Sequence, residues 1–168
     1  TGAAGLVGSV LRDGLKDDHD LSGVDRVAIE GFNCLVADTT DLDAVLPAYE
    51  GIDTVIDLAS VPSDDTPWEI VHQNNLTSTH NAMEASKRAG VKRVIFASSN
   101  HASGNYEDDY PYSAIVAGQY GGLDPDNIPY VTTSMPIRPD GDYGIGKAFG
   151  EAAGRYYSDR HGLSVICL

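Results

Sequence analysis

Five short apolar runs alternate with stretches of helical character, and this alternation limits what the chain can fold into more than any other feature. The predicted strands cover residues 20–25, 34–37, 54–59, 94–97 and 163–168, and the predicted helices cover residues 6–15, 42–49, 67–89 and 143–161. Strands that are separated by helices indicate a parallel sheet with right-handed crossovers. Because the strands are apolar along their length, we expect helices on both faces of the sheet, in a doubly wound α/β fold.

Glycines and a proline set the expected helix boundaries. Gly90 and Gly162 follow two of the predicted helices, at the position where glycine commonly ends a helix. Pro67 fits the first turn of the long helix, and Thr66 is the residue that we expect to cap it. Residues 100–142, rich in Tyr, Gly, Pro and Asp, match no element. Such a long stretch without secondary structure is uncommon in a compact domain, which indicates a functional loop.

The chain carries 25 acidic residues against 11 Lys and Arg, for a formal net charge of −14. The acids are spread along the sequence, which is typical of a surface solvated in high salt; an ordinary acidic cytosolic enzyme is the alternative. This charge disfavours nucleic acid and anionic membranes as partners, and no apolar run is long enough to span a membrane. Cys34 and Cys167 lie in separate apolar runs, so we expect buried, reduced thiols, a cytoplasmic location, no disulfide and no metal site.

The first eight residues, TGAAGLVG, place three glycines ahead of a predicted helix. Glycines allow a tight turn and a close approach of the backbone to a pyrophosphate, which then lies at a helix N-terminus. A dinucleotide site also needs an acid at the end of the second strand to bind ribose hydroxyls, and Asp25 stands there. We therefore predict that Gly2, Gly5, Gly8 and Asp25 bind NAD. The adjacent Arg26 keeps NADP as the alternative, because arginine can bind a 2′-phosphate.

Tyr143 and Lys147 lie four residues apart on a predicted helix, so their side chains face the same side. A nearby ammonium favours the phenolate, and we expect Lys147 to lower the pKa of Tyr143 so that the tyrosine acts as a general base. Ser98 and Ser99 follow the strand 94–97, at the edge of the sheet where ligands bind, and offer a hydroxyl to a substrate. The plain alternatives are a surface tyrosine with a solvated lysine, and two serines that open a loop.

Five motifs occur in order along the chain: TGAAGLVG, VIDLAS, NNLTST, FASSNH and YGIGK. Together they resemble the extended short-chain dehydrogenase/reductase family, the NAD-dependent epimerase/dehydratase group, over nearly the whole chain. The resemblance implies a Rossmann-type NAD-binding domain at residues 1–168. It also implies a first strand before Thr1 and a C-terminal substrate domain, so we expect a fragment that is incomplete at both ends.

The resemblance assigns cofactor contacts to individual residues. The glycines of the first turn correspond to the family's pyrophosphate loop, Asp25 to its ribose ligand, and Lys147 to the contact with the nicotinamide ribose. The remaining implied contacts are Asp38 on the adenine side, and Leu58, Ala59 and Ser60 along the cofactor.

The catalytic residues implied by the resemblance are Ser99 as the hydroxyl donor, Tyr143 as the base, Lys147 as its partner, and Asn75 as the helix asparagine that organises the site. Within the family, the segments ASSNH, PIRPDGDYGIGK and FGE are similar to uronate dehydrogenases and to the haloarchaeal NAD-dependent glucose-6-phosphate dehydrogenase group. Both oxidise C1 of a sugar to a lactone. The implied sugar contacts are Ser99, Asn100, His101 and Tyr143, with a plain loop histidine as the alternative for His101.

Three features depart from the family pattern. Asp57 stands where many relatives carry histidine, and a buried acid is costly unless it is paired. Gly146 replaces the usual small hydroxyl residue before Lys147, and glycine weakens a helix by about 1 kcal/mol relative to alanine. The segment between Ser99 and Tyr143 is also longer than the resemblance leads us to expect.

The favoured function is NAD-dependent oxidation of C1 of a hexuronate or a hexose 6-phosphate to a lactone, by a homodimer. The alternative enzyme is a nucleotide-sugar 4-epimerase or dehydratase with a tightly bound NAD. A non-catalytic dinucleotide-binding protein is the alternative from another class. The expected partners are a small-molecule sugar and a second copy of the chain.

Overall fold

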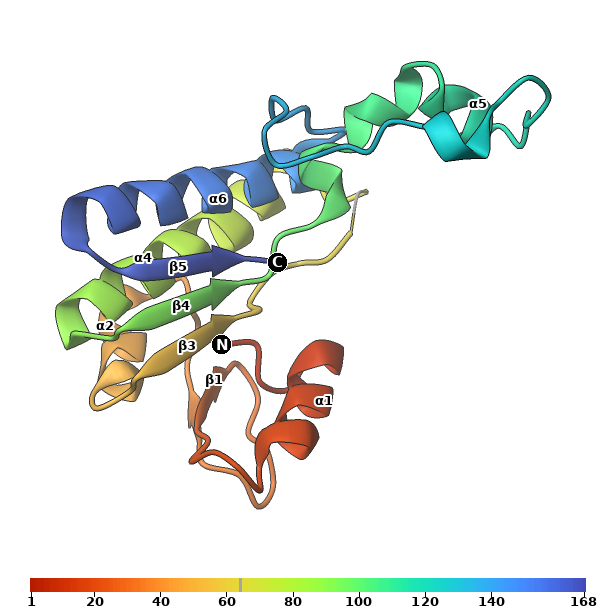
Figure 1. The fold of residues 1–168 in the computed structure, drawn as a ribbon. Coiled ribbons are helices and arrows are strands. Elements are labelled where there is room, and N and C mark those ends of the chain that lie inside the picture. Colours follow the sequence, from red (N-terminus) through yellow and green to blue (C-terminus); the bar gives the residue numbers. More distant parts are fainter. Residues whose placement is uncertain (64) are drawn as a thin grey trace.

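The computed structural model describes residues 1–63 and 65–168 as an α/β fold (Figure 1). The strands are β1 (Gly23–Asp25), β2 (Cys34–Val36), β3 (Thr54–Asp57), β4 (Arg93–Phe96) and β5 (Ser164–Cys167). The helices are α1 (Leu6–Leu15), α2 (Leu42–Val45), α3 (Trp68–Ile70), α4 (Thr77–Ala89), α5 (Tyr112–Val116) and α6 (Asp142–His161). Short 3-10 helices cover Leu46–Tyr49, Asn100–Ala102, Gly104–Asp108 and Pro125–Asn127, and a π-helical segment covers Val71–Leu76. This order confirms the predicted alternation of strands and helices, although most strands are shorter than predicted.

The described strands form two parallel sheets, β1–β2 and β3–β4–β5, and the first residues of the chain lie between them. The Thr1 nitrogen donates to the carbonyl of Ile56 on β3 at 2.8 Å, and the Ala3 amide donates to the carbonyl of Val24 on β1 at 3.4 Å. Figure 1 shows the N-terminus between β1 and β3. The predicted strand ahead of Thr1 stays a prediction.

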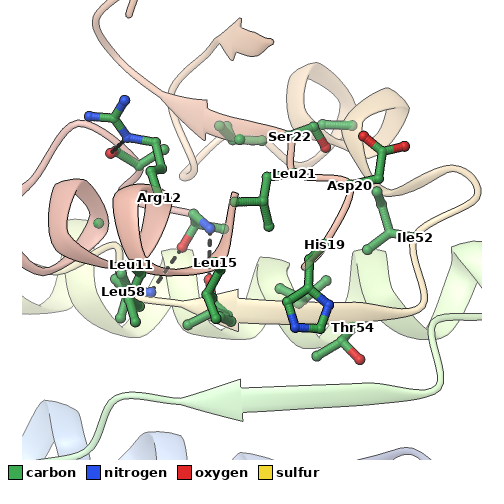
Figure 2. A pocket seen from close by; sticks show the side chains of 18 of the residues that line it. Leu11, Arg12, Leu15, His19, Asp20, Leu21, Ser22, Ile52, Thr54 and Leu58 are labelled. Carbon is green, nitrogen blue, oxygen red and sulfur yellow. Dashed lines mark hydrogen bonds between the residues drawn. The ribbon is translucent and has the colours of Figure 1, made fainter. Parts of the chain in front are cut away.

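A cavity of about 600 Å³ lies beside the first residues of the chain, between α1, β1 and β3 (Figure 2). Leu11 and Leu15 of α1 line it, together with Leu21 ahead of β1 and Ile56 of β3. It is the larger of the two cavities described here, yet of the predicted cofactor and catalytic residues only Gly8 and Leu58 line it. The cavity therefore marks the junction of the two sheets, and the candidate site lies elsewhere.

The core lies between the sheet β3–β4–β5 and the helices α4 and α6, which pack against each other. Val94 and Phe96 of β4 are buried, whereas Ile95 between them is half-buried, as expected for side chains that alternate along a strand. Met83 of α4 is fully buried against them. At Gly150, α6 approaches so closely that an added Cβ would overlap the ring of Phe96. The register of α6 over β4 therefore depends on this glycine.

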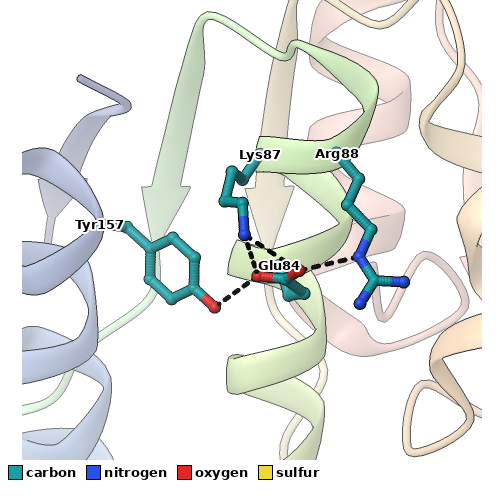
Figure 3. A network of polar contacts seen from close by, with 4 residues as sticks. All are labelled: Glu84, Lys87, Arg88 and Tyr157. Carbon is teal, nitrogen blue, oxygen red and sulfur yellow. Dashed lines mark hydrogen bonds and ion pairs between the residues drawn. The ribbon is translucent and has the colours of Figure 1, made fainter. Parts of the chain in front are cut away.

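A polar cluster joins α4 to α6 at the edge of the core (Figure 3). The carboxylate of Glu84 accepts hydrogen bonds from Lys87 Nζ at 3.0 Å, from Arg88 Nε at 2.8 Å and from Tyr157 Oη at 3.0 Å. Burial alone would raise the pKa of Glu84, but these hydrogen bonds outweigh it and lower the pKa to about 2. We call these four residues the Glu84 cluster.

The predicted helix ends are confirmed, and the predicted start of the long helix is wrong. Gly90 and Gly162 end α4 and α6 in the left-handed conformation, and their amides donate to carbonyls of the last turn. Pro67 is the capping residue of α3 rather than part of its first turn, and no side chain donates or accepts a cap hydrogen bond there. Between α3 and α4 the backbone widens into the π-helical segment that carries Asn75, so the predicted helix over residues 67–89 is not one continuous α-helix.

Two further expectations need correction. Residues 100–142 contain three short 3-10 helices and α5, and Figure 1 shows the part around α5 extending away from the sheets. Cys167 is exposed because it lies on β5 at the edge of its sheet, and Cys34 is half-buried, so the prediction of two buried thiols is wrong. Within residues 1–63 and 65–168, no helix has both the length and the apolar character needed to cross a membrane.

Candidate active site

The glycine-rich turn forms a cradle at the N-terminus of α1. Gly2 has φ of 65°, a left-handed conformation that favours glycine, and a Cβ there would lie 3.0 Å from the backbone carbon of Leu58. A Cβ on Gly8 would overlap the carbonyl oxygen of Gly2 and approach that of Ala3 to 2.8 Å. No side chain caps the first turn of α1, so its amides point to a space that suits an anion.

Two acids stand beside this cradle at the ends of the first two strands. Asp25 ends β1, and its carboxylate accepts hydrogen bonds from the amide of Ala4 at 2.8 Å and of Val27 at 3.3 Å. Asp38 follows β2, and hydrogen bonds from the amide and hydroxyl of Thr40 lower the pKa of its carboxyl group. Both side chains therefore have fixed orientations and keep lone pairs for a ligand.

A cleft of about 320 Å³ brings most of the predicted cofactor residues together. It is lined by Gly2, Gly5, Asp25, Asp38, Leu58, Ala59 and Ser60, with Arg26 and Asn74 among the other lining residues. The hydroxyl of Ser60 is buried and has no hydrogen-bond partner among the residues that the structure describes. A cradle that a Cβ would fill, an acid at the end of β1 and this free hydroxyl all fit a dinucleotide such as NAD.

Thr1 ties the glycine-rich turn to the segment after β3. Its hydroxyl donates to Asp57 Oδ1 at 2.6 Å and accepts from the amides of Leu58 at 3.2 Å and Ala59 at 3.1 Å. Asp57 is only 2% exposed, and burial raises the pKa of its carboxyl group. One oxygen of this acid is paired with Thr1, while Oδ2 has no partner within the described ranges. The hydrogen bond from Thr1 therefore offsets only part of the free-energy cost of burying the carboxyl group of Asp57.

Asn75 also binds the segment after β3, at Val61. It is 3% exposed, its Oδ1 accepts from the amide of Val61 at 2.8 Å, and its Nδ2 donates to the carbonyl of Val61 at 3.2 Å. A Cβ on Gly146 of α6 would lie 3.5 Å from the Cβ of Asn75 and 3.1 Å from Val71. The glycine that departs from the family pattern thus allows a close approach between α6 and the π-helical segment.

Tyr143 and Lys147 lie on the first two turns of α6, with Lys147 Nζ 5.4 Å from the centre of the Tyr143 ring. Lys147 is 5% exposed, and its Nζ donates to the carbonyl of Ala97 at 2.7 Å. Burial lowers the pKa of Lys147, an effect that the charge of Asp57 opposes. The lysine is therefore held at the carboxyl end of β4 by a buried hydrogen bond.

The expected fall in the pKa of Tyr143 is not found. Burial raises the pKa of Tyr143, and a hydrogen bond with Ser99 only partly opposes that effect. The reason is that desolvation penalises the phenolate, while the ammonium of Lys147 is engaged by the carbonyl of Ala97. The predicted spacing is correct, but in this arrangement the lysine does not by itself make the tyrosine acidic.

The two serines after β4 have different surroundings. Ser98 donates to Glu151 Oε1 of α6 at 2.5 Å, so its hydroxyl is already engaged. Ser99 is half-buried, its Oγ accepts from the amide of His101 at 3.3 Å, and its hydroxyl acts to lower the pKa of Tyr143. Ser99 is therefore the serine that lies on the side of Tyr143. Glu151 belongs to the segment FGE, for which the sequence predicts no contact with Ser98.

Of the predicted sugar contacts, His101 packs against Tyr143. The ring of His101 meets that of Tyr143 edge to face, with centres 5.6 Å apart and an interplanar angle of 74°. Nδ1 of His101 lies 2.7 Å from Oδ2 of Asp140, a residue that the sequence offered only within the motif PIRPDGDYGIGK. Asn100 is exposed next to Ser99, whose hydroxyl lies 3.3 Å from Asn100 Oδ1. The structure thus gathers Ser99, His101 and Tyr143 at one end of the sheet.

A glycine-rich turn, an acid that ends β1, and a tyrosine–lysine pair on the helix before β5 match the residue pattern of the short-chain dehydrogenase/reductase type. The chain belongs to the NAD dependent epimerase/dehydratase family, whose model matches residues 1–168. The predicted family and the Rossmann-type fold are therefore confirmed.

Individual relatives agree with this assignment. The chain is 40% identical over 171 residues to the L-arabinose 1-dehydrogenase (NAD(P)(+)) of Haloferax volcanii, covering 100% of this chain and 63% of that protein. It is 36% identical over 177 residues to the NAD-dependent glucose-6-phosphate dehydrogenase of the same organism, covering 99% of this chain and 64% of that protein. The crystal structure of uronate dehydrogenase from Agrobacterium tumefaciens aligns with a TM-score of 0.75 at 32% identity, over 98% of this chain and 56% of that one. The chain thus spans less than two thirds of the length of these relatives.

Proposed function

We propose that the protein is an NAD-dependent dehydrogenase that oxidises C1 of a sugar to a lactone. The observation that carries the proposal is the gathering of Ser99, Tyr143 and Lys147 at the carboxyl end of β4, beside the strand whose end lines the cofactor cleft. The names of the relatives support it, because an arabinose 1-dehydrogenase, a glucose-6-phosphate dehydrogenase and a uronate dehydrogenase all act on sugars or sugar acids.

The residues that would hold NAD follow from the geometry of the cleft. Gly2 and Gly5 would line the pyrophosphate site at the start of α1, Gly8 would let the turn pack closely against the helix, and Asp25 would accept hydrogen bonds from the ribose hydroxyls. The further contacts that we propose in the cleft are Asp38 on the adenine side, and Leu58, Ala59 and Ser60 along the cofactor. Outside the cleft, we propose Lys147 as the contact with the nicotinamide ribose.

In the proposed reaction, Tyr143 accepts the proton of the C1 hydroxyl at its Oη, and Ser99 donates a hydrogen bond to the same substrate oxygen. Burial raises the pKa of Tyr143, and Lys147, whose Nζ lies 5.4 Å from the centre of that ring, does not offset the rise. The role that we propose for Lys147 is the contact with the nicotinamide ribose. When bound, NAD supplies the hydride acceptor. Asn75 contributes indirectly, by fixing the segment after β3 through both bonds to Val61.

The substrate classes that we propose are a hexuronate, a hexose 6-phosphate and, from the names of the relatives, an aldopentose. Asn100 and His101 are the proposed sugar contacts beside Ser99 and Tyr143. We also propose a homodimer in the cytoplasm; the two cysteines, both free thiols, suit a reducing compartment. Light scattering after gel filtration tests the dimer directly.

The reaction is tested by NADH formation with the purified full-length protein, in high and low salt. L-Arabinose, glucose 6-phosphate, glucuronate, galacturonate and a nucleotide sugar form the substrate panel. We expect NADH from at least one of the first four. Conversion of the nucleotide sugar without net NADH would instead identify an epimerase or dehydratase, and NAD binding without any turnover would identify a binding protein.

Replacing the proposed base separates chemistry from binding. Tyr143→Phe removes the proton acceptor and keeps the ring, so we expect NAD affinity within about twofold of the parent and a fall in kcat of at least about a hundredfold. Tyr156→Phe is the matched control, because Tyr156 lies on the same helix with 54% of its surface exposed. Near-normal turnover by Tyr143→Phe would show that Tyr143 is not the general base.

A further inference from the structure

A histidine–aspartate pair lies beside the proposed base, and no step described so far uses the aspartate. His101, in the 3-10 helix after β4, has its Nδ1 2.7 Å from Oδ2 of Asp140, which lies two residues before α6. The side chains are 31% and 28% exposed, so the pair lies at the surface of the site and is not sealed in the core. The imidazole ring and the ring of Tyr143 meet edge to face, with their centres 5.6 Å apart.

The chain leaves room for this pair at two glycines. A Cβ on Gly104 would overlap the carboxylate of Asp140. A Cβ on Gly144 would overlap the carbonyl of His101 and come within 3.0 Å of Asp140 Oδ1. Residues near the two ends of the segment 100–144 therefore pack so tightly here that any side chain at positions 104 or 144 would displace the pair.

Other hydrogen bonds already hold the segment that carries Asp140. The amide of Arg138 donates to the carbonyl of Ala102 at 3.2 Å, and the amide of Asn105 donates to the carbonyl of Arg138 at 3.0 Å. Nδ2 of Asn105 also donates to the carbonyl of Pro139 at 2.7 Å. Because these bonds fix the backbone, the contact between Asp140 and His101 is not needed to hold the segment in place.

An ionised carboxylate only accepts hydrogen bonds, so the proton between the two groups belongs to Nδ1 of His101. In the neutral ring this leaves Nε2 without a proton, as an acceptor. The imidazole that carries this acceptor packs against the ring of Tyr143, so Nε2 suits a hydroxyl group of the substrate, which would donate to it while the C1 hydroxyl faces Tyr143 and Ser99.

We propose that Asp140 is a positioning residue that fixes the Nδ1–H tautomer of His101 and thereby presents Nε2 as the acceptor for a sugar hydroxyl beside Tyr143. The proposal rests on the proposed function for its substrate, but its tautomer is a property of the protein alone. It goes beyond the sugar contact at His101, because it assigns a role to Asp140. It also requires that the substrate group bound by His101 is a hydrogen-bond donor.

The tautomer is measured first, by NMR of the full-length protein labelled with ¹⁵N-histidine, without substrate, at about pH 8.5, where histidine rings are ordinarily neutral. A His101→Gln variant identifies the signal among the five histidines. We expect Nδ1 to carry the proton in the parent protein and that preference to be lost in Asp140→Asn, whose amide can either donate or accept. An Nε2–H tautomer in the parent protein would overturn the proposal whether or not the protein oxidises sugars.

Steady-state kinetics then tests what the tautomer does. In Asp140→Asn we expect KM for the sugar to rise about tenfold, the size of one lost hydrogen bond, with NAD affinity within about twofold of the parent. Asp140→Glu should recover part of the loss, and Asp126→Asn is the control, an exposed acid of the same long segment. An unchanged KM in Asp140→Asn would overturn the proposal.

A double-mutant cycle separates positioning from a general effect on structure. If Asp140 acts through His101, adding Asp140→Asn to a His101→Ala variant should change KM by less than about twofold. An equally large effect in both backgrounds would mean that Asp140 supports the site in another way, and the proposal would fail. If no sugar is oxidised at all, the proposed function fails, and the NMR result still decides the tautomer.

Discussion

The Glu84 cluster gives the most quantitative prediction, because it joins α4 to α6 with one carboxylate and three donors (Figure 3). We consider Glu84→Gln in the full-length protein. The amide keeps the size of the side chain but removes the charge that Lys87 and Arg88 neutralise, and its nitrogen cannot accept a hydrogen bond. The variant should therefore lose stability at neutral pH without leaving a cavity.

The magnitude follows from the pKa of Glu84, which the cluster lowers from 4.5 to about 2. Each pKa unit corresponds to about 1.4 kcal/mol, so the shift sets a ceiling of about 3 kcal/mol on what the charge contributes. The Glu84 side chain is 14% exposed, but those of Lys87 and Arg88 are 36% and 46% exposed, so solvent screens the interaction. We therefore expect a loss of about 1–2 kcal/mol.

The sign of the pH dependence follows from the direction of the shift. A carboxyl group whose folded pKa lies below its unfolded value stabilises the fold fully above the unfolded pKa of 4.5, and this contribution is lost as the pH falls toward 2. The difference in unfolding free energy between parent and variant should therefore be constant above about pH 5.5 and shrink below about pH 4.5.

Urea unfolding of both proteins at pH 7, 4 and 3, in one fixed salt concentration, measures this difference. Glu50→Gln, at an exposed position outside any helix, is the control and should leave the unfolding free energy within about 0.5 kcal/mol of the parent. A Glu84→Gln protein as stable as the parent at pH 7, or a difference that does not change with pH, would refute the reasoning.

Three further substitutions test the cofactor cradle and the core. Gly8→Ala should weaken NAD binding at least tenfold in a calorimetric titration, because its Cβ overlaps backbone atoms of the turn; unchanged affinity would contradict the cradle. Gly150→Ala should lower the unfolding free energy by about 1–3 kcal/mol, because the added methyl group overlaps the ring of Phe96. Asn75→Ala should cost about 1–3 kcal/mol by leaving both polar groups of Val61 unpaired, and normal stability would show that water replaces the amide.

Local chemistry made several features predictable from the sequence. Gly90 and Gly162 end α4 and α6 as expected, because a glycine after a helix adopts the left-handed conformation without steric cost. Gly2, Gly5 and Asp25 meet in one cleft because the turn and the strand end are each fixed by short-range rules. The motifs FASSNH and YGIGK lie side by side in the structure, where Lys147 Nζ donates to the carbonyl of Ala97.

Features that depend on packing were missed. The pKa of Tyr143 rises because the ring is partly buried, and burial cannot be read from a four-residue spacing. Asp140 meets His101 only because the long segment between them folds back, and a contact of that kind has no local signal. Cys167 lies in an apolar run, yet it is exposed because β5 is an edge strand of its sheet in the described part of the chain.

Transfer of hydride from C1 of a sugar is the central claim, and isotopic labelling tests it most directly. The full-length protein is incubated with NAD and a sugar deuterated only at C1, taken from the substrates that support turnover. We predict that mass spectrometry finds one deuterium in the NADH formed and none at C1 of the lactone. Deuterium that stays in the sugar while NADH forms, or a product that keeps the label with no net NADH, would contradict the claim.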